Sequence, residues 1–147
     1  MKIKTWTNFI PLWAGIASPA QANRMIATLL DPGQFWAPHG VRTLSKDEKP
    51  YDPERGYWRG PVWVLPNYLM MHGLLNYGHK AEAAELADKT QSLLIADFQK
   101  TGGMNENYNP ETGFPDASGH FVSWNLLAEH MKEEAASGSD PTAIPER

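Results

Sequence analysis

Residues 61–77 read PVWVLPNYLMMHGLLNY, and apolar side chains fall on every side of a helical turn across this stretch. A helix without a polar face is stable only when it is buried all round. Pro66 has no backbone N–H to donate, so we expect either a kink there or a helix that begins later than Pro61. Gly78 follows as a stop signal. The stretch therefore predicts one central, fully buried helix.

The segment that follows, residues 79–98, predicts a second helix of a different kind. One face is largely apolar and the opposite face is charged, which is typical of a half-exposed helix. The apolar face carries Ala83, Ala87, Thr90, Leu94 and Phe98, and the charged face carries Glu82, Glu85 and Lys89. A buried helix followed by a half-buried one indicates two helical layers packed on each other.

Two further helices are expected at the ends of the chain. Residues 19–31 begin with a capping box formed by Ser18 and Gln21, and they end at the turn signal of residues 31–33. Residues 122–136 have helical spacing as well. No stretch alternates with period two, so the sequence predicts an all-α fold over residues 1–136 and a disordered tail over 137–147.

Composition excludes several classes of function. The 147 residues carry a net charge of −4 with interspersed signs, so no basic stripe for nucleic acid is present. No apolar run approaches the roughly 20 residues that cross a bilayer, so we expect no membrane span. There are no cysteines, and the five histidines are scattered, so the sequence predicts neither a metal site nor a cofactor.

The loop of residues 34–59 ends in an aromatic motif, YWRGPVW, over residues 57–63. An arginine between tryptophans can hold a sugar hydroxyl or a carboxylate while the rings stack on a pyranose face. The alternative is structural: Trp58 and Trp63 would be core anchors, and Arg59 would pair with a carboxylate of the fold.

A second loop, residues 101–119, contains ENYNPETG over residues 106–113. Its Asn-Pro and Gly turn residues can fix the backbone, which would place Glu106 on a defined support. Glu106 is then a candidate general base, although many loop glutamates are simply solvated.

Beyond these residue-level patterns, a series of segments carries a family resemblance. The chain resembles the C-terminal stretch of the mannosylglycerate hydrolase-like and processing α-glucosidase I-like glycosidases, which are related to trehalases. The segments occur in one order: FIPLWAG at 9–15, Gln21-Ala22, Phe35-Trp36, Gly40, Tyr51, YWRGPVW at 57–63, NYL at 67–69, Gly73-Leu74, Tyr77-Gly78 and ENYNPETG at 106–113.

The resemblance implies an (α/α)6 toroid, of which this chain would supply four or five helices. It implies that Glu106 is the general base of an inverting α-glycosidase acting on α-glucosides or mannosylglycerate-like substrates. It also implies a carbohydrate-binding segment, and we expect substrate contacts from Tyr57, Trp58, Arg59, Gly60, Trp63 and Tyr108.

The family's general acid is an aspartate that lies before anything matching Met1, so the resemblance implies an incomplete site. Asp47, Asp52 and Asp116 are available carboxylates, but none stands in the acid motif. We therefore expect the chain alone to be inactive on glycosides. We also expect an uncovered flank on the buried helix, which the missing half of the toroid or self-association would cover.

Lys2, Lys4 and the apolar residues 9–17 imitate a secretory signal. The resemblance assigns this stretch to the domain, so we expect a cytoplasmic protein. Two alternatives remain: a glucoamylase-like or debranching-type toroid hydrolase, and a non-catalytic carbohydrate-binding or assembly module.

Overall fold

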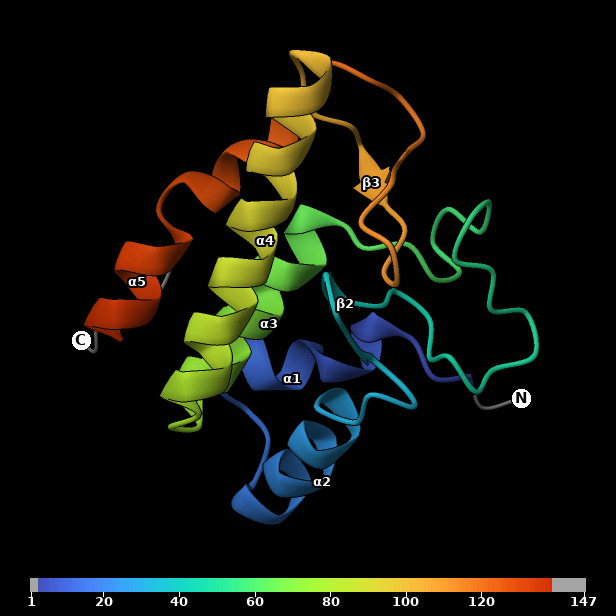
Figure 1. Cartoon of the computed structure of the whole chain (residues 1–147). Helices are drawn as coiled ribbons and strands as arrows, with labels where there is room; N and C mark the ends of the chain where they lie inside the picture. The colour runs from blue at the N-terminus through green and yellow to red at the C-terminus, as the bar shows by residue number, and fades with distance from the viewer. Residues whose placement is uncertain (1–2, 139–147) are drawn as a thin grey trace.

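The computed structural model describes residues 3–138, and its centre is helix α3 (Val64–Asn76). The other elements of this region surround α3 and extend from it (Figure 1). They are η1 (Trp6–Phe9), α1 (Ile10–Trp13), α2 (Pro19–Leu29), β1 (Trp36–Ala37), β2 (Gly40–Val41), α4 (Lys80–Thr101), β3 (Asn107–Tyr108), β4 (Pro115–Asp116), η2 (Ser123–Glu129) and α5 (Met131–Ser137).

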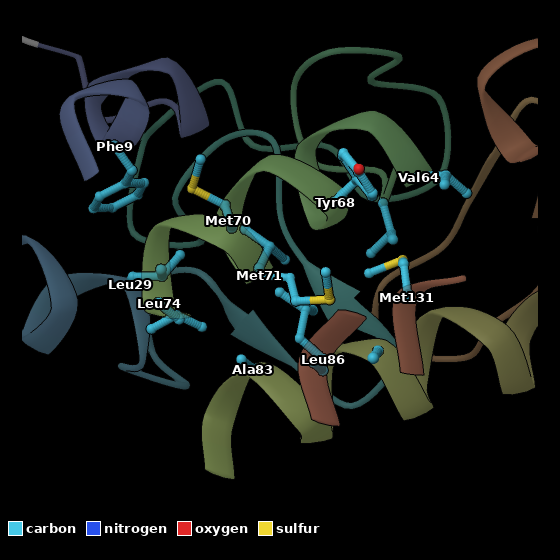
Figure 2. Packing of buried hydrophobic residues seen from close by; sticks show 14 of the residues in the cluster. Phe9, Leu29, Val64, Tyr68, Met70, Met71, Leu74, Ala83, Leu86 and Met131 are labelled. Atoms are coloured by element: carbon cyan, nitrogen blue, oxygen red, sulfur yellow. The ribbon is translucent and has the colours of Figure 1, made fainter. Parts of the chain in front are cut away.

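Helix α3 is buried as its sequence predicts. It contacts α1, α4, α5 and η2, and Met70, Met71 and Leu74 have no exposed surface (Figure 2). The helix begins at Val64 rather than at Pro61, and Pro66 lies in its first turn, where a missing backbone donor costs nothing. The delayed start is therefore the correct one of the two expectations for Pro66.

The packing leaves part of α3 less covered than the rest. We expected one flank of α3 to be uncovered, and Leu65, Leu69 and Leu75 are half-buried while Asn76 is exposed. Large exposed apolar side chains near this bundle also lie on the outer face of α4 and on η2 and the residue before it. They are Ile95, Phe98, Val122 and Leu126.

Helix α4 is longer than predicted and its inner face is shifted. Ala83, Ala87 and Leu94 are buried as expected, but Phe98 is 57% exposed. Asp97 is buried instead, because its carboxylate is hydrogen-bonded. In the last turns of α4, the buried face therefore includes the polar Asp97 and excludes the apolar Phe98.

The predicted helix over 122–136 is wrong as one element. The chain forms the 3-10 helix η2 and then α5, with a break at His130, whose φ and ψ are −107° and 2°. Gln91 on α4 explains part of this break, because its Nε2 donates to the carbonyls of Ala128 and Glu129 at 2.7 and 3.2 Å. Those carbonyls are satisfied from outside and do not require a continuous helix.

Two antiparallel hairpins, β1–β2 and β3–β4, were not predicted. Each strand has two residues, which is too short to show a period in the sequence. Helices η1 and α1 were also not predicted, while α2 has the expected capping box, with Ser18 N–H donating to Gln21 at 2.9 Å. Residues 139–147 of the expected tail lie outside the described residues.

Asn67 fixes the β1–β2 hairpin to the helical layers. Its Oδ1 accepts the N–H of Val41 at 2.9 Å, and its Nδ2 donates to Thr90 on α4 at 2.9 Å. Gly40 makes this close approach possible, because a Cβ there would lie 2.5 Å from Asn67 Nδ2 and its φ is +136°. Within residues 3–138, no helix is both long and apolar enough to cross a bilayer.

Asn67→Ala should lower the free energy of unfolding by about 2–3 kcal/mol, because the buried N–H of Val41 loses its acceptor. The matched control is Asn76→Ala on the same helix, where the exposed amide donates to two backbone carbonyls and its loss should cost about 1 kcal/mol or less. Urea denaturation measures both. Equal losses in the two variants would contradict a special role for the buried amide.

Candidate functional site

The two motif-bearing loops meet directly in front of α3. Val62 and Tyr108 form an antiparallel bridge in which each N–H donates to the other's carbonyl, at 2.8 and 3.0 Å. Val62 lies two residues before α3, and Tyr108 ends strand β3. The bridge therefore joins residues 57–63 to residues 106–113 and sets their relative position (Figure 1).

Stacked tryptophans form one wall of this region. The rings of Trp58 and Trp63 lie 3.9 Å apart with an interplanar angle of 11°. The Trp6 ring stacks on the Trp58 ring with a centroid distance of 6.2 Å. The Trp124 ring packs against the Trp63 ring with a centroid distance of 5.8 Å. Four tryptophans from three parts of the chain thus make one contiguous aromatic cluster.

Glu106 lies at the edge of this wall through its contact with Tyr57. The Tyr57 hydroxyl donates to Glu106 Oε1 at 3.2 Å, and the Tyr57 ring packs edge-on against Trp58 and Trp63 at 6.0 and 4.7 Å. Desolvation raises the pKa of Tyr57, and the hydrogen bond to Glu106 raises it further. The backbone N–H of Glu106 is held by the carbonyl of Ser118 at 3.0 Å. The structure therefore brings Glu106 to the aromatic wall.

Arg59 pairs with a carboxylate of the fold, which was the structural alternative to a sugar contact. Its guanidinium lies 3.8 Å from the Asp52 carboxylate and donates to the Pro50 carbonyl at 3.4 Å. Its side chain is 53% exposed. Arg59 thus pairs within its own loop and leaves solvent-facing surface for other contacts.

Gly60, Trp63 and Tyr108 do not present a surface for substrate. Gly60 is buried, and at its φ of +152° a Cβ would lie 2.8 Å from the Asp52 carbonyl. Trp63 and Tyr108 have no exposed area. The expectation that these residues contact sugar does not fit their burial, and their geometry gives them a supporting role beneath the site.

Tyr108 has a clear structural function. Its hydroxyl donates to the buried Asp97 carboxylate at 2.8 Å, and both groups accept the N–H of Asn105, at 2.9 and 2.8 Å. Burial raises the pKa of Tyr108, and the neighbouring Asp97 adds to the shift. The residue before Glu106 is thereby fastened to α4.

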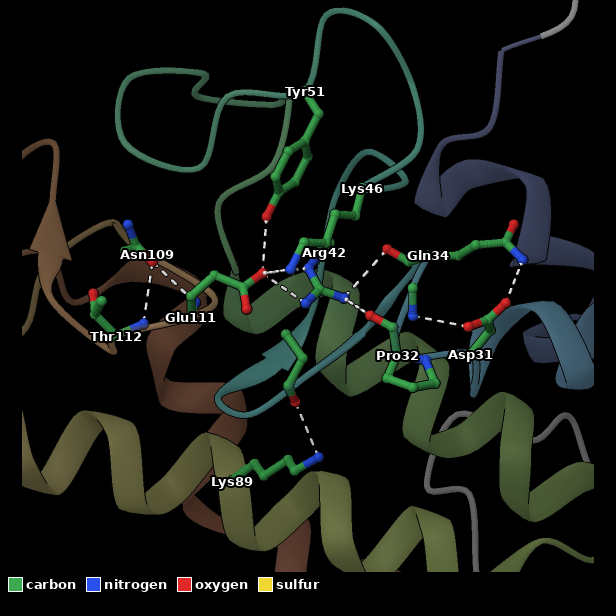
Figure 3. Close-up of polar contacts among 12 residues, drawn as sticks. Asp31, Pro32, Gln34, Arg42, Lys46, Tyr51, Lys89, Asn109, Glu111 and Thr112 are labelled. Atoms are coloured by element: carbon green, nitrogen blue, oxygen red, sulfur yellow. Dashed lines mark hydrogen bonds and ion pairs between the residues drawn. The ribbon is translucent and has the colours of Figure 1, made fainter.

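A second anchor was missed by the sequence analysis (Figure 3). Arg42, which is 1% exposed, donates from Nε and Nη2 to Glu111 Oε1 at 2.9 and 2.6 Å, and from Nη1 to the carbonyls of Pro32 and Gln34. Tyr51 also donates to Glu111 Oε1, at 3.2 Å. Glu111 belongs to the same motif as Glu106, so this anchor fixes the far end of the motif.

The electrostatics of the anchor follow from its partial burial. Desolvation pushes the pKa of Glu111 upward, but the hydrogen bonds and charge of Arg42, with Lys46 at 3.4 Å, more than offset it, so the pKa lies below its ordinary 4.5. Burial raises the pKa of Tyr51 to about 12. The sequence carries no clear signal for the anchor, because Arg42 stands in the stretch predicted to be a loop and its partner lies 69 residues away.

Among residues 3–138, no three histidine, aspartate or glutamate side chains gather as a metal site would require. The chemistry available here is that of a carboxylate, a phenol and aromatic faces.

Comparison with known proteins assigns the fold and motifs to a family. Residues 1–124 match the mannosylglycerate hydrolase MGH1-like glycoside hydrolase domain. The chain belongs to this family. It is thus a glycoside hydrolase by family, and the glucoamylase-like alternative is not the family that matches.

Individual relatives agree with this assignment. Mannosylglycerate hydrolase MGH1 of Selaginella moellendorffii is 34% identical over 123 residues, which are 82% of this chain and 23% of that protein. Mannosyl-oligosaccharide glucosidase of Saccharomyces cerevisiae is 27% identical over 121 residues, which are 74% of this chain and 14% of that protein. The chain spans less than a quarter of either relative.

A solved structure of the family is similar in fold. The GH63 mannosylglycerate hydrolase from Thermus thermophilus, crystallised with Tris and D-glycerate, superposes with a TM-score of 0.74 at 29% identity. The match covers 89% of this chain and 30% of that one.

Glu111→Gln should lower the free energy of unfolding at pH 7 by about 2 kcal/mol, because it leaves the Arg42 charge buried without a counter-ion. We place the loss below that of a fully buried pair because Glu111 is 33% exposed. Since the folded pKa is depressed, the contribution of Glu111 is present above its unfolded pKa of 4.5 and is lost as the pH falls through the folded value.

Urea denaturation of both proteins between pH 3 and pH 7 measures this difference. The control is Asp88→Asn, which removes an exposed ion pair with Lys132 of the same 2.6 Å length and should cost less than about 1 kcal/mol. A stability difference for Glu111→Gln that does not shrink at low pH would contradict the role assigned to its charge.

Proposed function

We propose that this chain carries the general-base side of an inverting glycosidase site, with Glu106 as the base. The observation that supports it is the contact of Glu106 with Tyr57 at the edge of the Trp58–Trp63 stack. A carboxylate beside flat aromatic faces suits one side of such a site, since the rings can stack on a pyranose and the carboxylate can activate water.

The reaction follows from this placement. Glu106 takes a proton from water while the water oxygen forms a bond to the anomeric carbon on the face opposite the leaving group. The glycosidic C–O bond breaks, and a second carboxyl group gives its proton to the leaving oxygen. Trp58, which is half-buried, and Arg59, which is exposed, have surface to contact the sugar.

We propose that the general acid comes from outside residues 1–147. Asp47 is bound to Lys4 and Ser45, and Asp52 accepts the N–H groups of Glu54 and Arg55. The pKa of Asp47 is lowered chiefly by the Lys4 hydrogen bond, and that of Asp52 chiefly by the backbone N–H of Arg55. A general acid needs the opposite, a raised pKa that keeps its proton. Asp116 accepts the N–H of Ala117 at the far strand of the hairpin.

The architecture that we propose around this site is part of an (α/α)6 ring, with α3 in the inner layer and α4 in the outer one. The burial of most of α3 and the single buried face of α4 support it. A largely apolar hollow of about 360 Å³ between α4 and η2, lined by Ile95, Met104 and Leu126, is a surface that a further part of the ring or a second copy could cover.

We propose carbohydrate as the ligand, and α-glucosides or mannosylglycerate as its class, from the names of the relatives. A non-catalytic sugar-binding module is the second candidate, because Trp58 could stack on a sugar without any proton transfer.

Glycosyl fluorides test the base without the acid, since fluoride leaves without being protonated. The isolated chain should release fluoride from α-glucosyl or α-mannosyl fluoride above the spontaneous rate, with the β-sugar as first product by NMR. Glu106→Gln should reduce this rate at least about 100-fold. Glu129→Gln, which changes an exposed residue at the end of η2, is the matched control and should leave the rate unchanged.

Mannosylglycerate and unactivated α-glucosides should not be hydrolysed by the chain alone. Turnover of these substrates that Glu106→Gln abolishes would contradict the missing acid. Sugar binding without fluoride release, unaffected by Glu106→Ala, would favour the binding module.

A further inference from the structure

The backbone of Tyr57 is strained. Its φ is +57°, in the left-handed region that residues with a Cβ adopt rarely and that glycine adopts freely. The side chain is 48% exposed, so burial of the ring recovers only part of that cost. An aromatic residue at such a position indicates that the place of its side chain matters.

Three contacts hold Tyr57 in this conformation. Trp63 Nε1 donates to the Tyr57 carbonyl at 3.0 Å, which fixes the peptide group. The ring then meets Trp63 edge-on at 4.7 Å and 84°, and Trp58 at 6.0 Å and 83°. Because Trp63 is fully buried and directly precedes α3, the support of Tyr57 is rigid.

This support points the Tyr57 hydroxyl toward the carboxylate of Glu106. The hydroxyl donates to Glu106 Oε1 at 3.2 Å. Among the described residues, Tyr57 provides the hydrogen bond to the Glu106 carboxylate, and Oε2 accepts none. The two carboxylate oxygens are therefore in different situations, one anchored and one open.

We propose that Tyr57 is a positioning residue for Glu106: its phenol anchors Oε1 so that Oε2 is the oxygen that takes the proton from water. This role rests on the proposed function of Glu106 and differs from a sugar contact. The strained backbone, held by the Trp63 indole, is the means by which the phenol reaches the carboxylate.

Carboxyl NMR of the ligand-free chain tests the anchor itself. With 13C-labelled glutamate at neutral pH, Tyr57→Phe should move the Glu106 Cδ resonance, which is assigned by its absence in Glu106→Gln. The matched control is Tyr51→Phe, which removes a bond of the same 3.2 Å length and should move the Glu111 resonance but not that of Glu106. An unmoved Glu106 resonance in Tyr57→Phe would overturn the proposal.

Fluoride release separates positioning from sugar contact. Tyr57→Phe should lower kcat for the α-glycosyl fluoride about 10-fold and leave KM within about twofold, because a misaligned base slows the step without weakening binding. Tyr77→Phe, whose hydroxyl bonds to the Ala17 carbonyl far from the site, should match the unmodified chain. A raised KM with unchanged kcat would overturn the proposal in favour of sugar contact.

The two measurements also distinguish this proposal from the function on which it rests. If Glu106→Gln removes fluoride release while Tyr57→Phe changes neither kcat nor the Glu106 resonance, Glu106 is still supported as the general base and the positioning role of Tyr57 is wrong. If the resonance moves but the unmodified chain releases no fluoride above background, the anchor exists and the catalytic function of Glu106 fails.

Discussion

The bridge between Val62 and Tyr108 is the constraint on which the site depends. Two hydrogen bonds join Val62 to Tyr108, which lies 46 residues further along the chain. Val62 lies two residues before the buried helix α3. Irregular loops lack a ladder of their own, so their position comes from such cross-links and from the rigid element that they share. Because most of α3 is buried among the helices that contact it, the bridge ties the segment that carries Glu106 to a rigid element.

Buried polar groups provide the remaining order. The carboxylate of Asp97 accepts from Tyr108 and Asn105, while the guanidinium of Arg42 binds Glu111 at the other end of the motif. Each of these groups would be costly to bury alone, and each is satisfied by the loop that it holds. The loop is thus fixed at both ends and in the middle, and Glu106 lies on its exposed side with few degrees of freedom.

The sequence predicted the parts of this structure that depend on local pattern. The buried α3, the half-buried α4 and the capped α2 follow from periodicity and capping, which act within a few residues. The break at His130 depends on Gln91, and the burial of Arg42 depends on Glu111, 69 residues away. Such pairs leave no period in the chain. Resemblance named Glu106 and Tyr57 together, but only the geometry separated exposed residues from the buried Trp63 and Tyr108 beneath them.

That separation explains why one motif contains both kinds of residue. Trp63 directly precedes the central helix, stacks on Trp58 and donates a hydrogen bond to the Tyr57 carbonyl, so a single buried indole supports the exposed part of the motif. Tyr108 does the same for the second motif by pairing with Val62 and Asp97. Each motif thus contains a buried anchor and, two to six residues away, a group that is at least partly exposed. The close spacing is required because rigidity falls quickly along a loop, and a carboxylate that must meet a water molecule in one orientation tolerates little displacement.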